Sequence, residues 1–307
     1  MLLCVLAGCG IENLVRGQDP EFQDPVVVVE TFEQAPHQKV DLLFVVDDTG
    51  SMAEEQAALA ESFAAFVGAI DELGLAYHIG VVTTASESDE AGILQGDPWI
   101  ITAASQDPVG DLAQAVDVGT DGVDEAGLGA MVLALSTPLV DDDNRGFRRA
   151  DAALHVVVLS DDDDASEDVL GADAAASATA FLEEQAEGTG FDAQLSAVIG
   201  DVPGGCRGPG GEAFPGTTYA EVAENTGGTV GSICEADLDA VLEAIVELSA
   251  HYPTTFELQA EPANKPRVAI DDERLDGGWV LEGTTLSFDD APPAGSLIEV
   301  RYELQTE

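Results

Sequence analysis

The sequence predicts an α/β fold, a mainly parallel sheet flanked by helices, followed by a small antiparallel β module. Near-continuous apolar runs, which are typical of strands buried on both faces, alternate with amphipathic helical segments through most of the chain. From Thr254 onward the helical period disappears, and short alternating runs are separated by turn residues. The boundary between the two regions is expected near Pro253.

The first predicted strand and helix enclose an acidic loop. Residues 40–48 (VDLLFVVDD) form an apolar run that ends in acids. Residues 51–74 then show apolar side chains at spacings of three and four, which predicts an amphipathic helix. Ser51 is the expected N-cap of this helix, and Gly74 is the expected stop.

The same alternation continues along the chain. Further strands are predicted at residues 76–85, 152–164 and 191–200, and further helices at 109–119, 124–138, 171–187, 217–228 and 235–252. The strand at 152–164 also ends in acids. We expect residues 253–307 to form the antiparallel module, and residues 10–36, which are rich in charge, Gln and Pro, to form a tether.

The charge of the chain restricts its partners. The 307 residues include 60 acidic and 10 basic ones, a formal charge of -50. Such a surface repels nucleic acid and anionic lipid, which require basic faces. It suits cations, basic partners or a medium of high salt, and most of the acids are expected to serve solubility.

The cysteines and the N-terminus indicate export. Leu6, Ala7, Gly8 and Cys9 resemble a bacterial lipobox, so residues 1–9 are expected to act as a lipoprotein signal peptide and Cys9 to be lipidated. The acyl chains would hold the protein on the membrane, facing the periplasm or the cell surface. Cys206 and Cys234 then remain in an oxidising compartment and are expected to form a disulfide.

The acidic loop FVVDDTGSM (44–52) has two interpretations. From Asp48 it contains Asp-Thr-Gly-Ser, the pattern of an aspartic protease loop. Such an enzyme needs two carboxylates that share a proton, and the sequence has no second Asp-Thr-Gly or Asp-Ser-Gly. The loop also leads into a helix, whereas protease loops lie in an all-β frame.

The second interpretation is a cation site. In open α/β sheets, ligands bind beyond the carboxyl ends of the strands, where the strand order reverses. Asp47 and Asp161 each follow an apolar strand, and they would converge if those strands are neighbours across the reversal. Thr49 and Ser51 alternate with Asp47, so one turn can direct three oxygens at an ion. Oxygen ligands favour Mg²⁺, with Ca²⁺ or Mn²⁺ as alternatives.

At this point residues 37–252 resemble a von Willebrand factor type A domain. The motif Asp-x-Ser/Thr-x-Ser of that family matches Asp47, Thr49 and Ser51, and its later acid matches Asp161 in LSD. The resemblance implies a Rossmann-like, doubly wound sheet with a metal-ion-dependent adhesion site. There the two hydroxyls bind the cation directly, the acids bind directly or through water, and a partner's carboxylate fills the open position. It therefore implies binding of a protein or surface polymer, without catalysis.

The third element of the family's site is a Thr on a loop before a helix, and this sequence departs from the pattern. Thr120 is the favoured candidate, although it lies further from the helix than in the family. Asp124 and Glu125 are the alternatives.

Other candidate sites are weaker. Residues 141–152 resemble an EF-hand loop, but Arg145 occupies a ligand position and Ala152 stands where Glu is needed. Asp162, Asp163 and Asp164 are candidates for a second cation site or for a solvated loop rim. His78 and His155, within apolar strands, are expected to be satisfied histidines of the core or sheet edge.

Three rival functions stay open, and one of them is a surface protein whose site has lost its metal role. A type A subunit coupled to an ATPase machine of the chelatase type would work in the cytoplasm, which the lipobox and the cysteine pair disfavour. A hydrolase that uses Asp48 is the third rival.

Overall fold

The computed structural model describes residues 26–35, 39–189, 191–250 and 252–304. The chain divides into two compact units. One is an α/β unit, His37–His251, and the other is a β unit that the chain forms before and after it. The lipobox with Cys9, and most of the segment expected to be a tether, lie outside the described residues.

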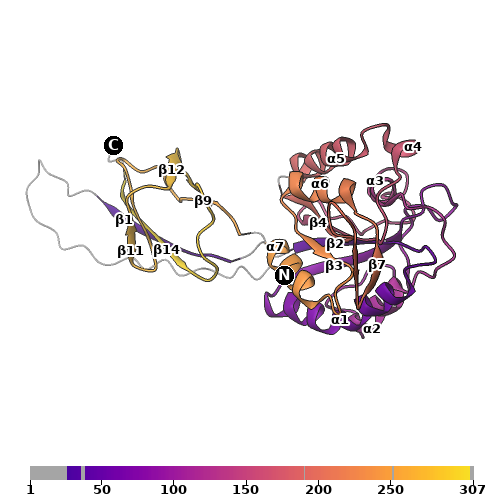
Figure 1. The fold of residues 1–307 in the computed structure, drawn as a ribbon. Helices are drawn as coiled ribbons and strands as arrows, with labels where there is room; N and C mark the ends of the chain where they lie inside the picture. The colour runs from indigo at the N-terminus through magenta and orange to yellow at the C-terminus, as the bar shows by residue number, and fades with distance from the viewer. Residues whose placement is uncertain (1–25, 36–38, 190, 251, 305–307) are drawn as a thin grey trace, which may run out of the picture. The chain divides into compact units, whose positions relative to one another are not determined.

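A five-stranded parallel sheet forms the centre of the α/β unit (Figure 1). Its order is β3-β2-β4-β5-β8, and each neighbouring pair runs parallel. The strands are β2 (Lys39–Val46), β3 (Ala76–Thr83), β4 (Ala153–Leu159), β5 (Ala193–Ile199) and β8 (Val230–Ser232). Every residue of β4 is buried, as its continuous apolar run predicts for a central parallel strand.

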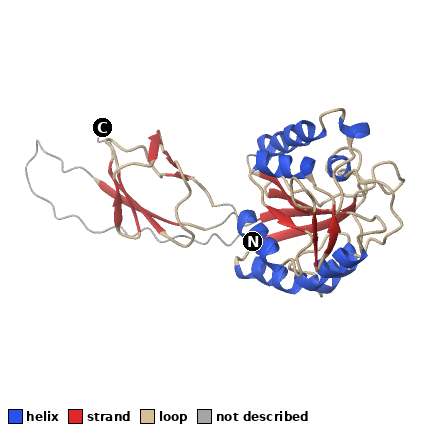
Figure 2. Ribbon diagram, viewed as in Figure 1, coloured by secondary structure: helices blue, strands red, loops and turns tan. Residues whose placement is uncertain are grey.

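Helices cover both faces of this sheet (Figure 2). One layer contains α1 (Ala53–Glu72), α2 (Pro108–Val116) and α7 (Asp239–Ser249). The other contains α3 (Gly127–Ala134), α4 (Glu167–Leu170), α5 (Ala174–Thr189) and α6 (Thr217–Thr226). On the α1 face, the ring of Phe44 packs edge-on against Phe63 and Phe66 at centroid distances of 5.8 and 5.5 Å. The predicted α/β architecture with a parallel sheet is therefore confirmed.

Helix ends agree with the prediction in part. Gly74 adopts a left-handed φ of 68° after α1, and its N–H bonds to the Asp71 carbonyl, as expected for a helix stop. The expected N-cap is wrong, because Met52 holds that position and no side chain caps the helix. Helix α3 ends at Ala134, before the predicted stop at Pro138, and the short helix α4 was not predicted.

The β unit contains two antiparallel sheets, ordered β1-β14-β10-β11 and β12-β13-β9. Its strands are β1 (Val27–Glu33), β9 (Thr255–Glu257), β10 (Arg267–Ile270), β11 (Glu273–Leu275), β12 (Trp279–Glu282), β13 (Thr285–Phe288) and β14 (Leu297–Glu303). Val268, Leu286, Ile298 and Val300 are fully buried in its core. The antiparallel module predicted from the C-terminal sequence is thus present.

Strand β1 departs from the prediction. Residues 10–36 were expected to be a tether, yet β1 pairs along its full length with β14, from Val27 opposite Glu303 to Glu33 opposite Leu297. Its side chains alternate, so Glu30 is buried while Val27 and Val29 are exposed. An edge strand with valines on its open face carries a weak sequence signal, which explains the error.

Among the described residues, none of the helices is both long and apolar enough to cross a membrane.

Candidate metal-binding site

The strand order places the two predicted acids side by side. Strand β2 comes first in the α/β unit, β3 joins one edge of it and β4 joins the other, so the order reverses between β2 and β4. The two strands end in register, with Val46 opposite Leu159, and the Asp47 N–H donates to the Leu159 carbonyl at 2.9 Å. Asp47 and Asp161 therefore follow adjacent strands at the position where open α/β sheets bind ligands.

Asp47 shapes the loop that follows β2. Its side chain is fully buried. Oδ1 accepts a hydrogen bond from the Thr49 N–H at 2.8 Å, and Oδ2 accepts one from the Ser160 hydroxyl at 2.6 Å. This turn brings the Thr49 and Ser51 hydroxyls to 3.4 Å from each other. Because each carboxylate oxygen has a further lone pair, the turn leaves acceptor capacity beside the two hydroxyls.

Asp161 completes a compact group of oxygens. Its residue is 6% exposed. Burial raises the pKa of the Asp161 carboxyl, a hydrogen bond from Ser51 acts in the opposite direction, and the charge of Asp47 raises this pKa further. Among the ion pairs of the described residues, none joins Asp47 or Asp161 to a basic side chain. Two buried carboxylates thus lie together without a cationic side chain between them.

The backbone around Gly119 and Gly122 forms a third loop, which hydrogen bonds hold beside these residues. The Gln56 amide donates from Nε2 to the carbonyls of Asp47 and Gly119, both at 2.9 Å. The Gly122 N–H donates to the Asp48 carbonyl at 2.8 Å. A Cβ at Gly122 would lie 2.2 Å from Asp48 Oδ1, so only glycine allows this approach. Sequence reasoning missed Gln56 and Gly122, and Gly122 in TDGVD was the available signal.

This loop contains the three candidates for the third site element. Thr120 is half-buried, and its carbonyl lies 3.7 Å from the Cβ position of Gly50. The Asp124 carbonyl accepts from the Thr84 hydroxyl at 2.8 Å. Burial raises the pKa of Glu125, and the charges of Asp162, Asp47 and Asp161 raise it further. The charge of Glu125 therefore interacts with those of the central acids.

Asp48 lies against this third loop. Its carboxylate accepts a long hydrogen bond of 3.5 Å from the Thr84 hydroxyl. Burial raises its pKa, a backbone hydrogen bond lowers it, and the charges of Asp47 and Asp124 raise it. Asp124 belongs to the sequence VDEA, which is not a protease loop.

The three acids after Asp161 have structural partners. Asp163 Oδ1 accepts from the Thr218 N–H at 2.8 Å, in the first turn of α6. Asp164 Oδ1 accepts from the Leu128 N–H at 3.0 Å, in the first turn of α3. Acids at helix N-termini stabilise the exposed N–H groups and the helix dipole. Two of the three acids are therefore helix caps, a role that neither prediction for this segment included.

In the described part of the chain, no three His, Cys, Asp or Glu side chains are grouped as a metal centre. The group formed by Asp47, Thr49, Ser51 and Asp161 differs from such a centre because half of its members are hydroxyls. Its set of oxygens fits a small cation of the Mg²⁺ type better than a transition metal that prefers nitrogen or sulfur.

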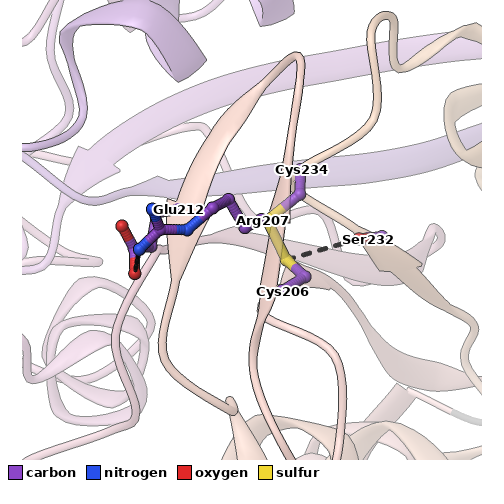
Figure 3. The surroundings of a disulfide bond; sticks show 5 residues. All are labelled: Cys206, Arg207, Glu212, Ser232 and Cys234. Atoms are coloured by element: carbon purple, nitrogen blue, oxygen red, sulfur yellow. Dashed lines mark hydrogen bonds and ion pairs between the residues drawn. A yellow bond between two sulfur atoms is a disulfide. The ribbon is translucent and has the colours of Figure 1, made fainter.

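A hairpin that a disulfide ties to the rest of the fold lies next to these oxygens, on the side of Asp161. Cys206 and Cys234 are joined, with Cα atoms 6.0 Å apart, so the predicted disulfide is present. Cys206 begins the hairpin of β6 (Cys206–Gly208) and β7 (Gly211–Ala213), and the Ser232 hydroxyl lies against its sulfur (Figure 3). The hairpin itself was not predicted, although the Gly/Pro segment RGPGG between the cysteines is a turn signal.

Glu55 lies between the hairpin and the acids. It is 4% exposed, and its Oε2 has no hydrogen-bond partner. A Cβ at Gly211 would lie 2.1 Å from Glu55 Oε1, so the hairpin turn packs directly on this carboxyl. Burial raises the pKa of Glu55, and the charge of Asp161 adds to the rise. The helical pattern of α1 did not distinguish Glu55 from its exposed neighbour Glu54.

The other residues considered in the sequence are structural. The ring nitrogens of His155 lie 2.7 and 2.8 Å from the hydroxyls of Ser249 and Ser196, which confirms a satisfied core histidine. His78 Nδ1 lies 3.0 Å from the Phe147 carbonyl. In the segment that resembled an EF-hand, Arg149 Nε donates to the buried Asp41 at 2.7 Å. That arginine is part of an ion pair within the fold.

Comparison with known proteins adds little to this description. No family model matches the sequence, and no curated protein matches it. The pilus adhesin SpaC of Lactobacillus rhamnosus GG, in its open conformation, aligns at 13% identity and a TM-score of 0.41 over 95% of this chain and 44% of the adhesin. A second crystal form of SpaC gives 12% identity and a TM-score of 0.38, over 95% of this chain and 45% of the adhesin.

Proximal thread matrix protein 1 of the mussel byssus aligns at 13% identity and a TM-score of 0.41, over 73% of this chain and 50% of its own. The chain thus spans half or less of each of these structures. At these TM-scores no argument about function rests on the similarities.

Proposed function

We propose that this protein binds a divalent cation beyond the carboxyl ends of β2 and β4, and through it a carboxylate of another macromolecule. Thr49 and Ser51 would hold the cation through their hydroxyls. Asp47 and Asp161 would balance its charge, directly or through water. This is the arrangement that the resemblance to von Willebrand factor type A domains implies. Thr120 or Glu125 would supply the third element of the site.

One observation carries the proposal. Asp47 is fully buried, Asp161 is 6% exposed, and the two acids follow adjacent strands beside two hydroxyls. Burying like charges together is unfavourable unless a cation neutralises them or a proton is taken up. Oxygen ligands favour Mg²⁺, with Ca²⁺ and Mn²⁺ as the alternatives.

The bound cation would serve adhesion or complex assembly rather than catalysis. A cation held on one side by the protein can accept a carboxylate of a protein or surface polymer on its open side. A free acid would otherwise be repelled by a chain with a formal charge of -50. We further propose that the protein is exported and anchored through Cys9, which rests on the lipobox sequence.

Paired substitutions test the cation site. Mg²⁺ at a hundred times its dissociation constant should stabilise the full chain by about 2.7 kcal/mol. Asp47→Ala should abolish this metal-dependent rise in melting temperature, and Ser51→Ala should reduce it. Asp48→Ala, which removes a neighbouring acid of the same loop, should leave most of it.

The metal-dependent rise is the relevant quantity, because Asp47→Ala also removes hydrogen bonds to Thr49 and Ser160 and lowers the baseline stability. Ser51→Ala is a milder change, since Ser51 is exposed and the hydrogen bonds that Asp47 accepts from Thr49 and Ser160 remain. A chain whose response to Mg²⁺ survives Asp47→Ala and disappears in Asp48→Ala would contradict the proposal and favour a site centred on Asp48.

A further inference from the structure

The two most exposed large apolar side chains of the described residues lie beside the candidate cation site. Val123 is 88% exposed and Phe214 is 69% exposed. Both belong to loops at the carboxyl edge of the sheet, where Asp47 and Asp161 are buried. Single exposed apolar residues are common, so their position relative to the site decides whether they have a role.

Val123 lies on the β3 side of the site. The Gly122 N–H donates to the Asp48 carbonyl, and the Gly122 backbone bridges Thr49. A few residues later, the Ala126 N–H donates to the carbonyl of Thr84, which follows β3. The backbone on both sides of Val123 is thus fixed to the acidic loop and to the end of β3, while its side chain projects into solvent.

Phe214 lies on the opposite, β5 side. Its N–H donates to the Asp161 carbonyl at 2.8 Å. A Cβ at Gly200, just after β5, would lie 1.8 Å from the Phe214 carbonyl oxygen, so the backbone there is packed closely. Along the carboxyl edge, in the strand order β3-β2-β4-β5, Val123 and Phe214 therefore flank the central acids.

The charges between these two side chains restrict what can approach. Glu125 and Asp162 lie close enough to the central acids for their charges to interact with them. A bound divalent cation can compensate for one incoming carboxylate, but further acids on a partner would meet this surface and the formal charge of -50. Apolar side chains next to the single carboxylate would instead contact Val123 and Phe214.

We propose that Val123 and Phe214 form an apolar rim that selects a polypeptide segment with one Asp or Glu flanked by apolar residues. The proposal rests on the cation site proposed above and identifies the ligand class of that site. The charges of Glu125 and Asp162 repel acid-rich segments, and the rim favours apolar neighbours through burial, so specificity arises from both terms.

Short fluorescent peptides test the rim with the full chain in Mg²⁺. One peptide carries a single glutamate between leucines, a second carries it between serines, and a third carries three consecutive glutamates. We expect the leucine peptide to bind about tenfold more tightly than the serine peptide, and the triple-glutamate peptide to bind most weakly. Chelation should abolish binding of all three.

Substitutions then assign this selectivity to residues. Phe214→Ser and Val123→Ser should each reduce the preference for leucine, and together they should bring it close to one. Both variants should keep the affinity for the serine peptide and the rise in melting temperature with Mg²⁺. Val230→Ser, which changes an apolar residue that is 47% exposed on the edge strand β8, is the matched control and should change nothing.

The outcomes separate the two proposals. Equal Mg²⁺-dependent binding of the leucine and serine peptides would overturn the rim and leave the cation site intact. A leucine preference that survives the double substitution would also overturn the rim. Failure of every peptide to bind in a Mg²⁺-dependent way would overturn the rim together with the carboxylate-binding function on which it depends.

Discussion

Glu54 and Glu55 are neighbours in the first turn of α1, yet their surroundings differ. Glu54 is exposed, whereas Glu55 is buried with an unpartnered Oε2 and a pKa raised by its burial. A raised carboxyl pKa means that the folded state favours the protonated form. Protonated Glu55 therefore makes its full contribution to the free energy of unfolding below the pKa of the unfolded chain, near 4.3 for glutamate. That contribution is lost as the pH rises through the higher pKa of the folded protein.

Glu55→Gln should therefore raise the melting temperature of the metal-free protein at pH 7 by a few degrees. The scale is the roughly 2–4 °C that about 1 kcal/mol gives in a domain of this size. The gain should shrink toward pH 4, where Glu55 itself becomes protonated. Glu54→Gln removes the same charge from the same helix turn and is the control for the helix dipole and for net charge. Thermal melts in chelator at the two pH values measure the effect, and an equal response of both variants would contradict it.

Residues could be assigned from the sequence where a local pattern determined their position. Asp47, Thr49, Ser51 and Asp161 were selected as candidates because acids and hydroxyls directly follow apolar strands, and the structure places these four close together. Asp164 was not recognised as a cap of α3, because its partner Leu128 is 36 positions away. Glu55 was not singled out either, since its burial depends on the β6–β7 turn, which is distant in sequence.

At the scale of elements, strands and helices with strong periodicity were predicted, and those without it were not. Strand β4 is buried along its whole length, so its apolar run was clear. Strand β1 lies at an edge, and its partner β14 is more than half the chain away. Hairpin β6–β7 has strands of three residues, too short for an alternating pattern to appear.

The disulfide should stabilise that hairpin measurably. It closes a loop with a sequence separation of 28 residues, for which the entropic model gives on the order of 3 kcal/mol. Reduction of the wild type should lower its melting temperature and speed amide exchange at Phe214. The double variant Cys206→Ser, Cys234→Ser should melt at the lower temperature with or without reductant. A wild type that is insensitive to reductant would show that the crosslink contributes little.

At the scale of the whole molecule, charge excludes one mode of membrane attachment. A chain with 60 acidic and 10 basic residues gains nothing from anionic lipid, so the membrane attachment proposed above would need another source. Cys9 is the predicted source. Labelled palmitate should enter the wild type, and Cys9→Ser should abolish labelling and move the protein from the membrane to the soluble fraction.

Cys4→Ser provides the control for that experiment, because Cys4 would be removed with the signal peptide. It should label and fractionate as the wild type does. Labelling that persists in Cys9→Ser, or an unlabelled wild type, would refute the lipid anchor.

Strand β1, whose position was not predicted, has a mechanical consequence. In the proposed anchored protein, tension between the membrane and a ligand on the cation would travel along the backbone of β1 and then of β2 to Asp47. This covalent path does not run through β9 to β14, which follow the α/β unit in the chain, although β14 is hydrogen-bonded to β1. Strand β2 lies between β3 and β4 and pairs in parallel with both, so a pull along it loads its flanking hydrogen bonds together, in shear. The cation site would thus be joined to the anchor through a strand that has a hydrogen-bonded neighbour on each side.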